Sequence, residues 1–166
     1  MIKNYSDYSK VLKTDNIVDA ICDTIKSDVS FKDFSCQIEK NLVTTSKKDY
    51  KSVINIIDKI TNNKIFEIYV SFCWNSENNY ILWIIGDWNN DTNEEDIHKY
   101  YEDMYNYEDK FKLFSSFLRN IFKVESNKTD FRFSLTGKSD DVNELDDIVS
   151  EIKPEKYEKF KQEKKV

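Results

Sequence analysis

The sequence predicts an α+β fold in which a sheet of three to five strands carries helices packed mainly on one face. Some segments place apolar residues at every second position and others at every third or fourth. The 166 residues suit one domain, since domains typically run to about 100–150 residues. With 39% apolar and 14% aromatic residues, the chain can build one core. We expect a single domain over 1–153 and a charged, frayed tail over 154–166.

The first predicted elements are a helix and a strand. The helix covers 15–27, where Thr14 or Asp15 can cap its N-terminus. Its apolar face has a spacing of four residues and consists of Ile17, Ile21 and Ile25. The strand lies in "FKDFSCQIE", where polar side chains alternate with Phe34, Cys36 and Ile38.

A second helix is predicted over 46–60. Ser46 and Asp49 provide an N-cap signal, and "TNN" after residue 60 provides a stop. The apolar stripe at helical spacing consists of Tyr50, Val53, Ile54, Ile57 and Ile60.

A hairpin over 64–74 and 80–88 should form the centre of the sheet. Both segments are apolar and aromatic, and the polar stretch "NSENN" separates them. We expect the hairpin residues Trp74 and Trp83 to be core residues.

After the hairpin the apolar period changes to about 3.5, which predicts one long helix or two abutting helices over 97–121. A strand follows at 130–136, and then a helix that Asp141 and Glu144 can open as a capping box. From residue 33 the order strand, helix, strand, strand, helix, strand is that of the ferredoxin-like, or split βαβ, plan. A similar mixed or antiparallel sheet gives the same pattern.

Composition disfavours several classes of protein. Two glycines in the whole chain exclude the glycine-rich phosphate loops of common nucleotide-binding proteins. Cys22, Cys36 and Cys73 are widely spaced, which indicates reduced, buried thiols rather than disulfides or a zinc site. The sequence has neither a signal peptide nor an apolar run of about 18–20 residues, so we expect a cytoplasmic protein.

The acidic stretch after the hairpin resembles a calcium loop but departs from it twice. Asp87, Asn89, Asp91, Asn93 and Glu95 alternate like calcium ligands, but Thr92 replaces the required glycine and His98 replaces the bidentate glutamate. Helix capping by Asp91 or Thr92 explains the stretch as well. The single histidine, His98, belongs to no nucleophile motif. The sequence therefore predicts no metal, no cofactor and no catalytic residue.

Charge distribution is the strongest functional signal. Residues 87–109 contain nine acids and one lysine, a net charge of −8, and residues 139–151 carry a net charge of −6. Such segments are often solvated helix faces, but aromatic residues among the acids favour a protein interface. The predicted partner-binding residues are Trp88, Asp91, Glu94, Glu95, Asp96, Glu102, Asp103 and Tyr105.

The leading hypothesis is a non-catalytic protein that neutralises a basic protein partner, such as a toxin or a nucleic-acid enzyme, in the manner of an immunity protein or a phage inhibitor. We expect no direct contact with nucleic acid, because acidic segments repel phosphates, and none with membranes. One alternative is a small-ligand protein or metal-dependent enzyme with a pocket beside the 64–88 hairpin, using Asp87 and His98. Another is a structural subunit that dimerises through an exposed sheet face.

Overall fold

The computed structural model describes residues 5–43, 49–74, 79–89, 97–124, 131–138 and 143–164. The elements in chain order are helix α1 (Tyr5–Ser27), 3-10 helix η1 (Val29–Phe31), strands β1 (Phe34–Val43), β2 (Asp49–Asp58), β3 (Lys64–Trp74) and β4 (Asn79–Trp88), helix α2 (Ile97–Ile121), strand β5 (Arg132–Lys138), and helices α3 (Asn143–Glu151) and α4 (Pro154–Lys164).

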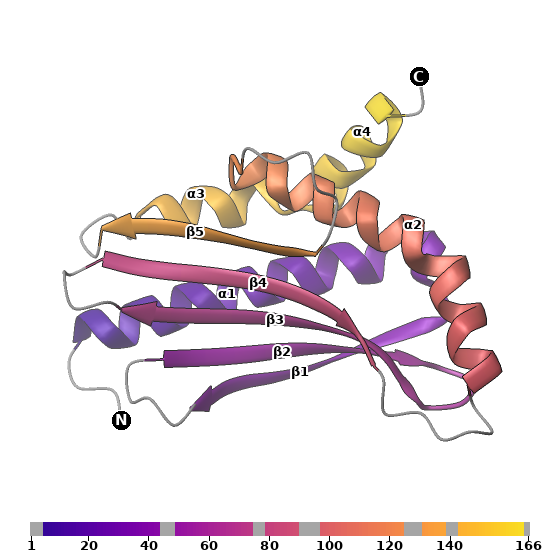
Figure 1. Cartoon of the computed structure of the whole chain (residues 1–166). Helices are drawn as coiled ribbons and strands as arrows, with labels where there is room; N and C mark the ends of the chain where they lie inside the picture. The colour runs from indigo at the N-terminus through magenta and orange to yellow at the C-terminus, as the bar shows by residue number, and fades with distance from the viewer. Residues whose placement is uncertain are drawn as a thin grey trace.

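The five strands form one sheet in the order β1-β2-β3-β4-β5, and every neighbouring pair is antiparallel. The described helices lie on one face of this sheet (Figure 1). The predicted α+β class, with an antiparallel sheet and helices on one face, is confirmed. The hairpin of β3 and β4 and the single long helix α2 also lie where the sequence predicts them.

Residues 49–58 are strand β2, so the helix predicted over 46–60 is wrong. A short apolar run fits a helix and a buried strand almost equally well, and β-branched residues favour the strand. Seven consecutive residues, 52–58, are buried in β2, which one helix face could not achieve. Ile60, expected on the helix's apolar stripe, lies instead in the turn after β2 and is 88% exposed. The split βαβ plan depended on that helix and is not the observed topology.

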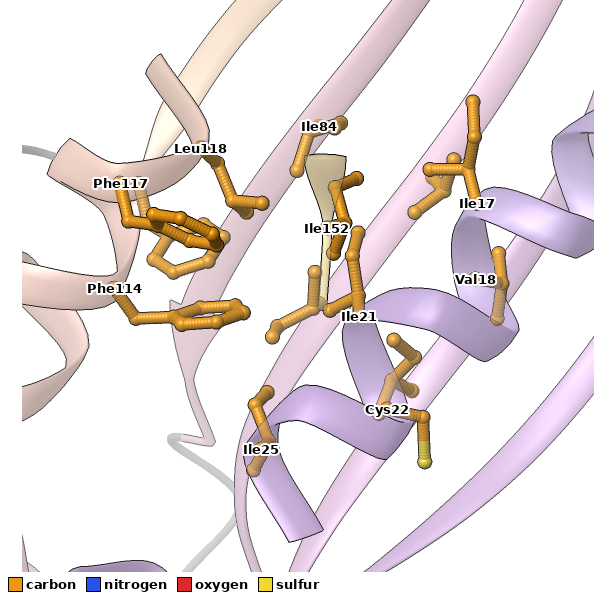
Figure 2. Close-up of a cluster of buried hydrophobic side chains, with 14 of the residues drawn as sticks. Ile17, Val18, Ile21, Cys22, Ile25, Ile84, Phe114, Phe117, Leu118 and Ile152 are labelled. Atoms are coloured by element: carbon orange, nitrogen blue, oxygen red, sulfur yellow. The ribbon is translucent and has the colours of Figure 1, made fainter. Parts of the chain in front are cut away.

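Helix α1 packs on the sheet through the predicted isoleucines. Ile17, Ile21 and Ile25 are at most 1% exposed and lie in one buried cluster with Ile84 of β4, Ile152 and the α2 residues Phe114 and Phe117 (Figure 2). The predicted N-cap is wrong, because α1 begins at Tyr5. Thr14 and Asp15 therefore lie within the helix, where both are buried, and the Ser52 hydroxyl donates to Asp15 Oδ1 at 3.3 Å.

Aromatic rings join α2 to the sheet. Phe111 stacks on Phe66 of β3 with ring centroids 4.1 Å apart, and Phe114 stacks on Phe131 at 6.3 Å. Gly86 of β4 lies beneath this layer. A Cβ atom there would lie 2.6 Å from Phe66 and 2.7 Å from Phe131, closer than carbon atoms can pack, so the layer requires glycine at this position.

Residues 154–164 form α4, which corrects the expectation of a frayed tail. Tyr157 is 1% exposed and its ring packs edge-on against Phe114 at 5.1 Å. Phe160 packs against Phe117 at 5.5 Å. The high lysine and glutamate content suggested a solvated segment. However, Tyr157 and Phe160 are three residues apart, so they lie on the same face of the helix and pack on the core.

Two ionisable side chains of α4, Tyr157 and Lys161, should make the folded protein less stable in alkaline solution. Burial raises the pKa of Tyr157. Although burial opposes the charge of Lys161, hydrogen bonds with Glu158 and Asp28 raise its pKa as well. Both folded pKa values exceed the unfolded ones, so this stabilisation is complete below about pH 10 and is lost as pH rises further. Urea unfolding midpoints should fall above pH 10, and Tyr157→Phe should make the fall less steep; an unchanged fall would contradict the Tyr157 contribution.

The second face of the sheet carries no described helix, and we call it the helix-free face. Strand alternation places on it residues 35, 37 and 39 of β1, 51–57 (odd numbers) of β2, 67–73 (odd numbers) of β3, 81–87 (odd numbers) of β4, and Arg132, Ser134 and Thr136 of β5. Trp83 lies there and is 38% exposed, so its predicted place in the core is wrong.

Candidate functional site

The predicted partner-binding residues separate into three groups. Glu102, Asp103 and Tyr105 lie in the first half of α2, whereas Trp88 ends β4. The other four, Asp91, Glu94, Glu95 and Asp96, lie outside the described residues, as does most of the calcium-like stretch.

Exposed tyrosines and acids share one face of α2. Tyr101 is 57% exposed and Tyr105 is 82% exposed, and Glu102 and Asp109 are exposed beside them. The spacing of these four residues places them within about 100° around the helix axis. We call them the α2 surface. The opposite side of the helix carries Tyr107 and Phe111, which pack on the molecule.

Contacts with η1 and with Asp33, the residue before β1, hold α2 in place. The Tyr107 hydroxyl donates to Asp33 Oδ2 at 3.4 Å, and Lys110 Nζ donates to the Ser30 carbonyl at 3.3 Å. The Lys59 amide donates to the Asp33 carbonyl at 3.0 Å. These contacts bring α2 to the end of the sheet, visible on the right in Figure 1. The same end presents two exposed apolar side chains, Val29 at 77% and Ile60 at 88% exposure.

Trp88 does not belong to the α2 surface. It is half-buried, with its ring edge-on to Phe66 at 5.0 Å and to Phe111 at 5.4 Å. Through Phe111 its ring contacts the packed side of α2. In contrast, sequence spacing alone could not distinguish Tyr101 from a core residue, because Tyr101 and the packed Tyr107 belong to the same apolar repeat.

A small pocket of about 210 Å³ lies between the end of β4 and α2, beside the predicted hairpin. Half of its lining residues are aromatic, and the lining consists of Phe66, Gly86, Asp87, Trp88, Glu108, Phe111, Lys112 and Phe131. Glu108 and Lys112 form an ion pair at 3.0 Å. The pocket therefore offers an apolar interior with a mixed-charge rim.

Two residues that the sequence offered for a metal site, Asp87 and His98, lie within the described part of the chain. Among the described residues, no group of three or more histidine, cysteine, aspartate or glutamate side chains could hold a metal ion. Asp87 lies at the end of β4, on the strand face opposite Trp88, and His98 lies in the first turn of α2.

The three cysteines are free, as predicted, but only Cys22 is buried, whereas Cys36 and Cys73 are half-buried. Cys22 of α1 is buried and forms a side-chain hydrogen bond with Cys36 of β1. This bond lowers the pKa of Cys22, whereas the same bond and burial raise the pKa of Cys36. The wide sequence spacing gave no sign of this pair, because the contact depends on how α1 lies on β1.

No protein-family model, curated protein or solved structure matches this chain. Its function must be inferred from its own surfaces. Within the described part of the chain, no helix is long and apolar enough to cross a membrane.

Proposed function

We propose that this chain is a non-catalytic cytoplasmic protein that binds and neutralises a basic protein partner through the α2 surface. The observation that carries the proposal is the pair Tyr101 and Tyr105, largely exposed on a helix whose opposite side is packed. Buried tyrosine at an interface supplies large contact area at low entropic cost, and such anchors dominate binding energy.

The negative charge of the α2 surface and of the surrounding segment favours a basic partner. The α2 surface adds Glu102 and Asp109 to the tyrosines, and the whole segment 87–109 carries a net charge of −8. Clustered negative charge steers a positive partner and speeds association. An inhibitor of the immunity-protein or phage type, directed at a toxin or nucleic-acid enzyme, fits this chemistry. Three free cysteines support a reducing, cytoplasmic setting.

The test compares two variants of the full chain. The partner is first purified with the tagged chain from the native host at low salt and released at high salt. Tyr101→Ala with Tyr105→Ala should weaken its binding at least about tenfold, mainly by faster dissociation. Glu102→Lys with Asp109→Lys should slow association and flatten its salt dependence.

Glu163→Lys near the end of α4 serves as the matched charge control, because Glu163 is also exposed but lies outside the α2 surface. It should leave association unchanged within about twofold, as expected for a charge outside the interface. Equal binding by the wild type and both α2 variants would refute the proposed surface.

A further inference from the structure

Strand β4 is apolar on both faces, although the described helices cover one. Its inward residues Tyr80, Leu82 and Ile84 are at most 1% exposed. Three consecutive outward residues, Ile81, Trp83 and Ile85, are also apolar, and the charged Asp87 follows them at the end of the strand. A strand with one solvated face normally alternates apolar and polar residues, and a continuous apolar run is typical of strands that are buried on both faces. The β4 sequence therefore indicates that another surface covers the helix-free face.

The three outward residues form a ridge in which small side chains flank Ile81 and Trp83, whereas Ile85 lies between Tyr69 of β3 and Arg132 of β5. In the sheet register Trp83 lies between Ser71 of β3 and Ser134 of β5. Ile81 lies between Cys73 and Thr136. These neighbours of Trp83 are shorter than tryptophan and cannot cover its whole ring, and Trp83 is 38% exposed. We call Ile81, Trp83 and Ile85 the β4 ridge.

The charge of the helix-free face favours a second copy of the chain. Its charged residues are Glu39, Lys51, Glu67, Asp87 and Arg132, together with Lys64, which pairs with Ile57 across a β-bulge. Their net charge is 0, compared with −6 for the whole chain. Two copies that met through acidic regions would repel each other, whereas this face allows close approach. A basic partner would gain little attraction here.

Charged residues of the helix-free face are paired within the chain, which also favours the close approach of a second copy. Glu67 forms an ion pair with Lys64 and accepts a hydrogen bond from the Tyr69 hydroxyl. Burial opposes the charge on the Glu67 carboxylate, but these two hydrogen bonds lower its pKa. Lys51 lies 4.0 Å from the centre of the Tyr69 ring. These charges have partners within the chain, so a second copy need not neutralise them.

We propose that two copies of this chain pair through their helix-free faces. The dimer would be a twofold-symmetric sandwich of two sheets, with each β4 ridge packed over the serine positions beside the other. This interface is separate from the α2 surface, so one dimer would present two α2 surfaces. The proposal does not depend on the function proposed above.

Sedimentation velocity of the full chain, at about 1–100 µM, tests the proposal in a range that detects micromolar dimers. The wild type should approach twice the 19.8 kDa chain mass as concentration rises. Trp83→Thr, which suits a strand, should raise the dimer dissociation constant about 30-fold or more. Tyr105→Ala on the α2 surface is the matched aromatic control and should leave the dissociation constant unchanged.

Two results would overturn the proposal: a wild-type monomer at every concentration, or a dimer that Trp83→Thr does not weaken. Circular dichroism and the urea midpoint must show that the variant folds. If Trp83→Thr does not fold, Ser134→Arg decides the question, because it places a large charged side chain beside the ridge on both copies. A folded Ser134→Arg protein that still dimerises with wild-type affinity would also overturn the proposal.

Discussion

Replacing Tyr157 by alanine is expected to lower the free energy of unfolding by about 3–5 kcal/mol. The side chain is 1% exposed and its ring packs against both Phe114 and Phe117 of α2 at 5.1 Å. Alanine would leave a cavity between α4 and α2, and the surrounding aromatic rings could collapse into it in part at most. Urea denaturation monitored by circular dichroism measures the loss.

Lys159→Ala is the matched control for this prediction. Lys159 lies on the same helix, but it is exposed, so its substitution should change the free energy of unfolding by less than about 0.5 kcal/mol. If Tyr157→Ala and Lys159→Ala had equally small effects, α4 would contribute little to the core, contrary to its packing in the structure.

The second large effect is expected at the buried ion pair between α4 and the turn after α1. Lys161 Nζ lies 3.1 Å from Asp28 Oδ1, and their side chains are 18% and 3% exposed. Asp28 Oδ1 also accepts a hydrogen bond from the Ser30 amide, which caps η1. Oδ2 is buried and accepts no hydrogen bond from a described residue. Lys161 is therefore the cation that compensates a buried carboxylate.

Lys161→Met should lower the free energy of unfolding by about 3 kcal/mol, because it leaves the Asp28 charge buried without compensation. Adding Asp28→Asn should recover part of this loss, since asparagine retains the cap and carries no charge. Thermal and urea unfolding of the single and double variants form the test.

An exposed ion pair provides the comparison. Lys40 lies 2.8 Å from Asp19, but these side chains are 38% and 46% exposed. Lys40→Met should cost at most about 1 kcal/mol, because water already solvates both charges. Equal losses from Lys40→Met and Lys161→Met would show that burial does not determine the effect.

Local periodicity was sufficient for the strongly patterned elements. The α1 isoleucines, the β3–β4 hairpin and the long helix α2 follow directly from spacings of four, two and about 3.5 residues. It failed at β2, where Val53, Ile54 and Ile57 fit both periods and pairing with β1 and β3 decided the outcome. Periodicity also failed at α4, because only two aromatic residues, Tyr157 and Phe160, mark its buried face in a segment rich in lysine and glutamate.

For the candidate surfaces, the sequence determined the charge, and the tertiary structure determined which side chains are exposed. Charge is additive along the chain, so the sequence by itself determined that 87–109 is strongly acidic and rich in aromatic residues. Exposure is a property of packing between distant segments. Only the tertiary structure decided that Tyr105 is exposed while Trp88 is half-buried beneath α2, and that Trp83 stands on a sheet face that the described helices leave open. The reason is physical: all the described helices pack on one side of a sheet whose strand β4 is apolar on both.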